Sequence, residues 1–93
     1  MSVRKRDGRI VPFDQSRITN AVYRAMQAAE EGDLSRDPRL VSGRAVQELS
    51  KKFLSSHVPT IEEIQDLVET ALILLDFPKT AKAYILYRSK RAE

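Results

Sequence analysis

Apolar residues recur every three or four positions through most of this chain beyond residue 16. That spacing lines one face of an α-helix, and three long stretches and one shorter stretch show it. The first sixteen residues lack this period and instead form two short extended runs, residues 3–6 and 9–13. The pattern predicts an α+β fold that is mainly α: a four-helix bundle capped at one end by a small β-hairpin or, if Val58 adds a strand, by a three-stranded sheet.

The dipeptide Asp7-Gly8 separates the two extended runs. A two-residue Asp-Gly link is typical of a hairpin with a type I′ turn, because that turn requires positive φ at both central residues. Pro12 has no amide hydrogen to donate, so we expect the second strand either to be an edge strand or to end there.

The first helix is expected to begin after Asp14, whose carboxylate can accept from the amide of Ser16 or Arg17 as an N-cap. Gly32 is the expected stop at its C-terminal end. Arg17 lies in the first turn, where a cation opposes the helix dipole unless an anion lies nearby. The predicted buried stripe of this helix comprises Ile18, Ala21, Val22, Ala25 and Met26.

Three further helices are predicted. The dipeptide Asp37-Pro38 is typical of a cap followed by a first-turn proline, although Gly43 weakens the helix and favours a later start. Thr60 and Glu63 have the spacing of a capping box, which opens the third helix. The predicted buried stripes are Val41, Ala45, Val46, Leu49 and Phe53 in the second helix, Ile61, Ile64, Val68, Ala71, Leu72 and Leu75 in the third, and Ala81, Tyr84, Ile85 and Tyr87 in the fourth, over residues 79–91.

Short loops in a four-helix bundle make consecutive helices antiparallel. The first and third helices would then begin at the hairpin, and the fourth would end there. We therefore expect two basic clusters that are distant in sequence to meet at this end of the bundle. They are Lys5, Arg6 and Arg17 from the start of the chain and Arg88, Lys90 and Arg91 from its end.

Composition narrows the classes of function. The chain has 93 residues, of which 42% are hydrophobic and 31% charged, and this suits one small folded domain over residues 1–93. It has no cysteine and a single histidine, His57, so neither a disulfide nor a metal site is expected. The longest apolar run, residues 71–75, is too short to span a membrane, and the charged opening differs from a signal peptide. These features favour the cytoplasm.

Positive charge is concentrated at the start of the chain. Residues 1–17 contain five basic and two acidic side chains, and their net charge of +3 equals that of the whole chain. Cations beside a helix N-terminus suit a polyphosphate, because free amides and the helix dipole there also attract anions. The alternative is that these cations only discourage pairing at an exposed strand edge. Neither common glycine-rich nucleotide fingerprint occurs in the sequence.

The order of residues in this opening is more specific than its composition. Val-x-Lys-Arg-Asp-Gly at residues 3–8, Val-Pro-Phe-Asp at 11–14 and Ser-Arg-Ile at 16–18 resemble the opening of the ATP-cone. This is a small nucleotide-binding regulatory domain best known at the N-terminus of ribonucleotide reductases. The segments 59–69, 81–84 and 87–88 resemble it too, so the likeness covers nearly the whole chain.

The resemblance implies a nucleotide site at the hairpin. The residues that match ligand-contacting positions of the family are Val3, Lys5, Arg6, Asp14 and Arg17. The full expected nucleotide-binding set is Val3, Arg4, Lys5, Arg6, Val11, Asp14, Arg17, Thr60, Arg88, Lys90 and Arg91. In this set the two valines would pack on the base, the cations would hold the phosphates, and the threonine would serve mainly as a helix cap.

By resemblance, the chain would be an allosteric sensor that binds ATP or dATP and controls an attached body, most often a ribonucleotide reductase, through altered oligomeric contacts. Mg²⁺ would accompany the triphosphate, held mainly by phosphates and water. The sequence offers no nucleophile–base pair, so we expect no catalytic residue here. The enzyme would be the remainder of a longer protein.

Two other readings stay open. A basic helical module could bind nucleic acid or another protein, but the excess charge of +3 is small and no recognition helix stands out, so nucleic acid is not the expected partner. The chain could also be the cone of a transcriptional repressor or a kinase-like protein, or a cone that has lost its ligand. No membrane contact is expected.

Overall fold

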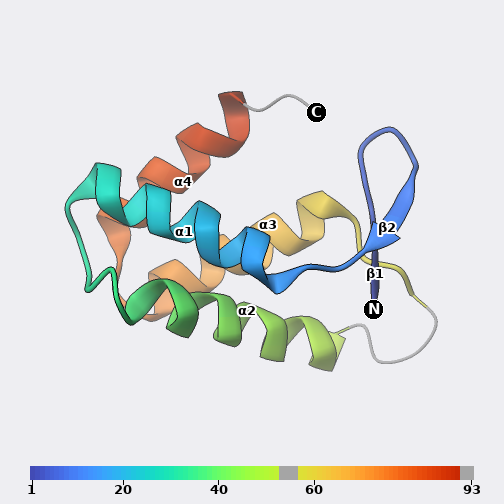
Figure 1. The fold of residues 1–93 in the computed structure, drawn as a ribbon, viewed down its shortest axis with the longest axis horizontal. Helices are drawn as coiled ribbons and strands as arrows, with labels where there is room; N and C mark the ends of the chain where they lie inside the picture. Colours follow the sequence, from blue (N-terminus) through green and yellow to red (C-terminus); the bar gives the residue numbers. More distant parts are fainter. Residues whose placement is uncertain (53–56, 91–93) are drawn as a thin grey trace.

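The computed structural model describes residues 1–52 and 57–90. In this part of the chain it has two strands and four helices: β1 (Ser2–Arg4), β2 (Ile10–Pro12), α1 (Gln15–Ala29), α2 (Asp37–Lys52), α3 (Ile61–Leu74) and α4 (Pro78–Lys90). The predicted class, mainly helical α+β with a small sheet at one end, is confirmed (Figure 1). Phe53 and Arg91, which the sequence analysis assigned to a buried stripe and to a basic cluster, lie outside the described residues.

The hairpin turn differs from the predicted type I′ turn. The amide of Gly8 donates to the carbonyl of Lys5 (3.0 Å), and the amide of Lys5 donates to the carbonyl of Arg9 (2.8 Å). Gly8 has a φ of 89°, whereas Asp7 is not among the residues with positive φ. These features are typical of a three-residue loop that ends in a left-handed glycine, the other common way to close a hairpin.

The register of the hairpin follows from this turn. β1 and β2 pair antiparallel with Val3 opposite Val11, one residue away from the register that a two-residue loop would impose. Val3 is buried and Val11 half-buried, so the observed register puts both valines on the face that packs on the helices.

The sheet has two strands within the described residues, and the expected third strand is reduced to one bridge. Arg4 pairs with Thr60 in a parallel bridge, and its amide donates to the carbonyl of Pro59 (2.9 Å). Proline cannot donate to a ladder, which limits pairing along this segment. The bridge lies on the β1 side, so β2 is the edge strand, as Pro12 predicted.

α1 begins as expected and ends earlier. The carboxylate of Asp14 accepts from the amide (3.0 Å) and the hydroxyl (2.6 Å) of Ser16, which completes the predicted N-cap. The helix stops at Glu30, which adopts the left-handed conformation (φ 52°), so Gly32 is not the stop. Glu30 can end the helix because its amide still reaches the carbonyls of the last turn.

α2 starts at Asp37, not later as Gly43 suggested. A turn stabilises this start, because the amide of Asp33 donates to the carboxylate of Asp37 (2.7 Å) and the carboxylate of Asp33 accepts from the amide of Ser35 (2.9 Å). These hydrogen bonds to carboxylates, worth ~1.5–3 kcal/mol each, outweigh the ~1 kcal/mol cost of one glycine.

The predicted capping box of α3 is confirmed, whereas one residue predicted to be buried in α4 is exposed. The capping box of α3 is present, since the amide of Glu63 donates to the hydroxyl of Thr60 (3.1 Å) and the amide of Thr60 donates to the Glu63 carboxylate (2.9 Å). Ile85 of α4 is 42% exposed, so its predicted inward position is wrong. α4 instead buries the side that carries Thr80, Ala81 and Tyr84.

The helices form a closed ring of contacts in which α1 packs against α2 and α4, and α3 packs against the same two helices. Figure 1 shows the hairpin at the end of the bundle where α1 and α3 begin and toward which α4 runs. The core is apolar, and its largest fully buried aliphatic side chains are Met26, Leu49, Leu72, Val22, Val41 and Val68. Within the described ranges, no helix combines the length and the apolar character needed to cross a membrane.

The opposite end of the bundle is held together by a carboxylate. Glu31, in the loop after α1, accepts from the amides of Thr80 (2.8 Å) and Lys79 (3.4 Å) in the first turn of α4. Burial alone would raise the pKa of Glu31, but these hydrogen bonds outweigh it and lower that pKa. Glu31 therefore caps a helix that lies far from it in sequence.

Candidate functional site

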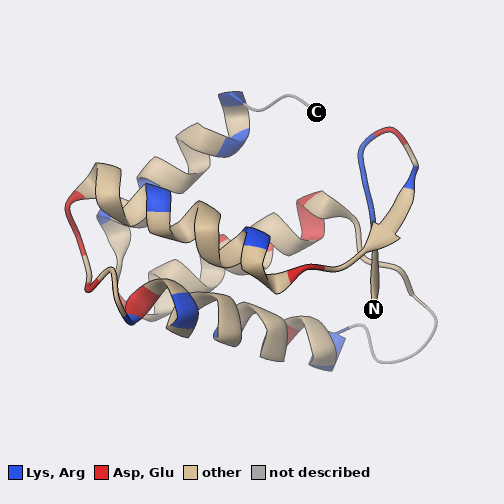
Figure 2. Ribbon diagram, viewed as in Figure 1, with Lys and Arg blue, Asp and Glu red and all other residues tan. Residues whose placement is uncertain are grey.

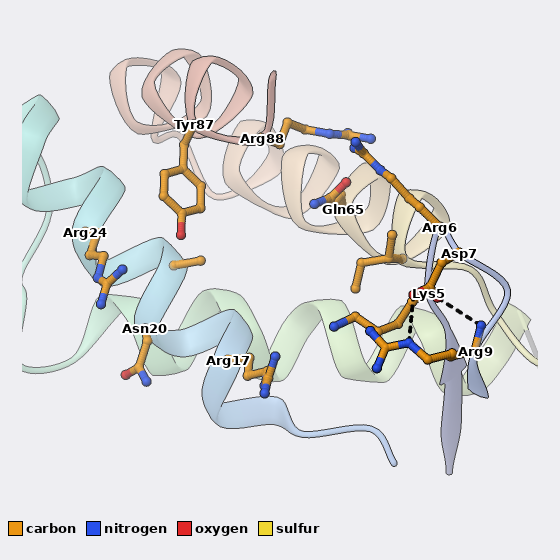
Figure 3. Close-up of a pocket in the computed structure, with 12 residues that line it drawn as sticks. Lys5, Arg6, Asp7, Arg9, Arg17, Asn20, Arg24, Gln65, Tyr87 and Arg88 are labelled. Carbon is orange, nitrogen blue, oxygen red and sulfur yellow. Dashed lines mark hydrogen bonds and ion pairs between the residues drawn. The ribbon is translucent and has the colours of Figure 1, made fainter. Parts of the chain in front are cut away.

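A cavity of about 540 Å³ lies between the hairpin loop, α1, α3 and the last turns of α4. Figure 3 shows side chains from all four elements pointing into it. Six of the lining residues are basic and one, Asp7, is acidic. The lining residues are Lys5, Arg6, Asp7, Arg9, Arg17, Asn20, Ala21, Arg24, Ile61, Gln65, Tyr87 and Arg88.

α1 supplies a row of polar side chains to one wall. Arg17, Asn20 and Arg24 are spaced three and four residues apart, so they follow one another along the same side of the helix (Figure 3). Within residues 1–52 and 57–90, no ion pair involves Arg17, Arg24 or the hairpin's Lys5. Each of these cations can therefore bind an anionic ligand without first releasing a carboxylate.

The other cations of the cavity already have carboxylate partners. Arg6 Nε lies 2.6 Å from Glu62 Oε2, and Arg9 Nε lies 2.7 Å from Asp7 Oδ2. The amide of Arg9 also donates to Asp7 (3.1 Å), and these contacts lower the pKa of the Asp7 carboxyl. Figure 2 shows basic segments on the hairpin loop, α1 and the end of α4, with an acidic first turn of α3 near the hairpin.

Arg88 of α4 is a largely enclosed cation of the cavity. Its side chain is 17% exposed, and its guanidinium donates to Asp66 (2.9 Å) and to Glu69 of α3. Burial opposes the charged form, but the two carboxylates outweigh it and raise the pKa of Arg88. One turn earlier on the same helix, burial raises the pKa of Tyr84 to about 12, so this phenol stays neutral.

Gln65 contributes a polar atom that lacks a partner. Its Oε1 is buried and accepts no hydrogen bond from any described residue. In Figure 3 its side chain lies between the hairpin cations and the end of α4. Leaving a buried acceptor unpaired costs ~1–3 kcal/mol, so this atom is suited to a ligand that brings an N–H or O–H group.

A second cavity of about 410 Å³ adjoins the first beneath the hairpin. The two cavities share Lys5, Arg9, Arg17 and Ile61. The walls of the second are mainly apolar, and they also include Val3, Val11, Pro12, Phe13, Asp14, Ile18 and Ile64. An apolar slot thus opens directly onto the cationic cavity, an arrangement that suits a ligand with one flat apolar end and one anionic end.

No metal site accompanies these cavities in the part of the chain that the structure describes. It contains no group of three or more histidine, aspartate and glutamate side chains placed to hold an ion. A divalent cation would therefore have to arrive with a ligand that supplies most of its coordination.

Comparison with known proteins identifies the fold. A family model described as the ATP cone domain matches residues 1–93. The chain belongs to the ATP-cone family. The resemblance inferred from the opening motif is thereby confirmed.

The relatives of this ATP-cone are reductases. It is 42% identical over 92 residues to the vitamin B12-dependent ribonucleoside-diphosphate reductase of Thermoplasma acidophilum, a match that covers 94% of this chain and 11% of that protein. It is 38% identical over 93 residues to the reductase of the same name from Mycobacterium tuberculosis, covering 98% of this chain and 12% of the relative. The anaerobic ribonucleoside-triphosphate reductase of Escherichia coli is 36% identical over 89 residues, 96% of this chain and 12% of that protein. The ATP-cone spans about a tenth of the length of these proteins.

The structure places most of the predicted site residues around the two cavities of the ATP-cone. Four line the cationic cavity: Lys5, Arg6, Arg17 and Arg88. Val3, Val11 and Asp14 line the apolar slot, together with the shared Lys5 and Arg17. Arg4, Thr60 and Lys90 line neither cavity; the guanidinium of Arg4 donates to the carbonyl of Gly8 (3.4 Å), and Thr60 is the cap of α3.

Six polar residues that line the cationic cavity of the ATP-cone were not predicted from the sequence. They are Asp7, Arg9, Asn20, Arg24, Gln65 and Tyr87. The helical members of this group lie beside the buried stripes of their helices. Polar residues that flank a stripe at helical spacing are a signal that could have found them, but only once the packing of α1 against α4 is known.

Proposed function

We propose that this ATP-cone binds an adenine nucleotide, ATP or dATP, and acts as the effector-binding domain of a ribonucleotide reductase. The observation that carries the proposal is the cavity with six cations and one carboxylate, which opens onto an apolar slot under the hairpin. Family membership and reductase relatives support the same function.

The base would occupy the slot. Val3 and Val11 stand opposite each other in the hairpin, and Ile61 and Ile64 of α3 line the same slot. Apolar walls suit an aromatic base, and nearby backbone groups of the hairpin can distinguish an adenine edge from other bases. A pyrimidine would fill less of this slot, so we expect discrimination in favour of adenine.

The phosphates would extend into the cationic cavity. Lys5 and Arg17 line both cavities, so they are placed where the sugar-phosphate part of the ligand would cross from one to the other. The start of α1 adds the positive end of its dipole. An anion here would also remove the unfavourable interaction between Arg17 and that dipole.

The nucleotide would regulate the remainder of the reductase, which carries the catalytic residues. A nucleotide controls an attached enzyme only if it binds the two states of that enzyme with different affinities. We propose that ATP and dATP differ in this respect through contacts of the cone with neighbouring parts of the reductase or with a second copy of the chain. Mg²⁺ would enter with the triphosphate and be held mainly by phosphate oxygens and water.

Calorimetric titration tests the proposal directly. ATP, dATP, GTP and CTP would be titrated into the chain in the presence of Mg²⁺, and each mixture would be passed over a sizing column. We expect measurable affinity for the two adenine nucleotides, at least about tenfold weaker affinity for CTP, and a change of elution with dATP. Equal affinity for all four nucleotides, or none for ATP and dATP, would contradict an adenine effector site.

A further inference from the structure

α3 carries a row of carboxylates next to the cationic cavity. Glu62, Asp66 and Glu69 are spaced four and three residues apart and so lie along one side of the helix. None of the three is among the residues that line the cavity, yet each holds an arginine that is. We call these three residues the acidic row.

The acidic row separates the two cations that it holds from three cations of the cavity that have no carboxylate partner among the described residues; the sixth, Arg9, pairs with Asp7. Arg6 donates to Glu62 at 2.6 Å, and Arg88 donates to Asp66 at 2.9 Å and to Glu69. Lys5, Arg17 and Arg24 have no such partner within the described ranges. Figure 3 shows Arg6 and Arg88 reaching toward the same space from the hairpin and from α4, while Arg17 and Arg24 point in from α1.

We propose that the acidic row competes with the phosphates of a bound polyphosphate for Arg6 and Arg88. The inference rests on the proposed function, since it concerns the same site. An N–H group that donates to a carboxylate cannot donate with full strength to a phosphate oxygen at the same time. The carboxylates also repel the incoming phosphates across a cavity in which charges are only partly screened by water.

If the arginines exchange the acidic row for a ligand, the ligand becomes linked to the hairpin loop and to the end of α4. In the free protein the acidic row ties the hairpin loop, through Arg6, and the end of α4, through Arg88, to the same helix. When a polyphosphate takes both arginines, these two ties are lost and both elements become joined to the ligand. The free and bound states then differ in defined contacts, and such a difference is what an effector needs in order to shift an equilibrium.

Neutral isosteric variants test the proposal. Glu62→Gln removes one competing charge from a partly exposed side chain, and Asp66→Asn combined with Glu69→Gln removes the pair that holds Arg88. Glu48→Gln is the matched control, because Glu48 also pairs with cations, Arg44 and Lys51, but lies in α2 and lines neither cavity. Each variant would be titrated with ATP and, separately, with inorganic tripolyphosphate, and its fold would be checked by thermal unfolding.

We expect tighter binding when the row is neutralised. Glu62→Gln should raise the affinity for both ligands about two- to fivefold, which corresponds to the free energy of an exposed ion pair. The double variant should tighten binding of both about tenfold, since it frees Arg88 from two charge-assisted contacts, one of them with Glu69, whose side chain is mostly shielded from water. Glu48→Gln should leave both affinities within about twofold of the parent.

The outcomes separate this inference from the proposed function. The proposed competition would be contradicted if Glu62→Gln and the folded double variant bind both ligands no more tightly than the parent, even if ATP binds the parent well. Tighter binding of tripolyphosphate without any binding of ATP would support the competition and contradict the adenine site. Failure of both ligands to bind every variant would contradict both.

Discussion

The two ends of the bundle use carboxylates in different ways. At the end away from the hairpin, Glu31 and Asp37 accept from backbone amides, which are fixed by the helices to which they belong. At the hairpin end, Asp14 and Glu63 also cap helices. Beside these caps, Glu62, Asp66 and Glu69 accept from arginine side chains, which have many rotatable bonds. A backbone amide keeps the direction that its turn gives it, whereas a guanidinium can turn toward a new anion.

This difference separates stability from function within one small domain. Capping at the far end fixes the start of α4, so that movement of this helix is restricted there. Among the described residues, Arg88 makes the ion pairs that tie the opposite end of α4 to α3, and Arg88 lines the cavity. A ligand at the hairpin end can therefore change the contacts of Arg88 without disturbing the caps that Glu31 and Asp37 form at the far end.

The largest expected effect is on ligand affinity at the hairpin end. Lys5→Ala should weaken ATP by ~1.5–3 kcal/mol, because it removes a charge-assisted contact from a cation that has no carboxylate to give up. Arg6→Ala should cost less, because Arg6 must first leave Glu62. Calorimetry of both variants measures the order; a greater loss for Arg6→Ala would contradict the distinction between the two sets of cations. Thermal unfolding of both should stay close to that of the parent.

The next effect is on stability at the far end. Glu31→Ala should lower the free energy of unfolding by ~1–2 kcal/mol, because the amides of Thr80 and Lys79 lose their acceptor. Affinity for ATP should remain close to that of the parent, since Glu31 lines neither cavity. Denaturant unfolding measures the loss. Glu30→Ala, which changes the neighbouring exposed carboxylate, is the control and should have an effect below ~0.5 kcal/mol.

At acid pH, the difference in stability between the parent and Glu31→Ala should disappear. The pKa of Glu31 is lowered in the folded protein from its ordinary value of 4.5, so its contribution is fully present above that pH. The contribution is lost as the pH falls below 4.5 and through the folded pKa, where the carboxylate takes up a proton. Melting temperatures measured from pH 7 down to pH 3 should converge; a gap that stays constant would show that charge on Glu31 has no part in the cap.

The smallest expected effect concerns Gln65. Gln65→Met keeps a similar volume and removes the buried Oε1 that has no partner among described residues. Stability without ligand should stay the same or rise by up to ~1 kcal/mol, while ATP binding should weaken by ~0.5–1.5 kcal/mol if a ligand group donates to that oxygen. Unfolding and calorimetry on the same variant test both parts. A clear loss of stability would mean that the glutamine matters for packing.

Local signals predicted the elements of the fold because the residues that decide them are close together in sequence. Asp14 capped α1, and Thr60 with Glu63 capped α3, as their spacing indicated. The hairpin register could not be predicted in this way, because Asp7-Gly8 suits either a two- or a three-residue loop. The choice depends on which register buries Val3, and that depends on helices that arrive later in the chain.

The site was predictable in part for a similar reason. The opening motif identified Lys5, Arg6 and Arg17, and the antiparallel order of helices brought Arg88 to the same end. The partners of these cations were not predictable. Whether Arg88 meets Asp66 depends on the rotation of α4 against α3, which sequence spacing within one helix does not define.

The walls of the cavity come from residues 5–24 at one end of the sequence and residues 61–88 at the other. The cavity therefore does not exist in a chain in which α4 has not yet docked on α1. A ligand that requires all these walls binds only the native protein and stabilises it in proportion to the logarithm of its concentration. If α4 docks after the rate-limiting step of folding, such a ligand will slow unfolding and leave the folding rate unchanged. Nucleotide would then act on the lifetime of the folded domain rather than on the speed at which it forms.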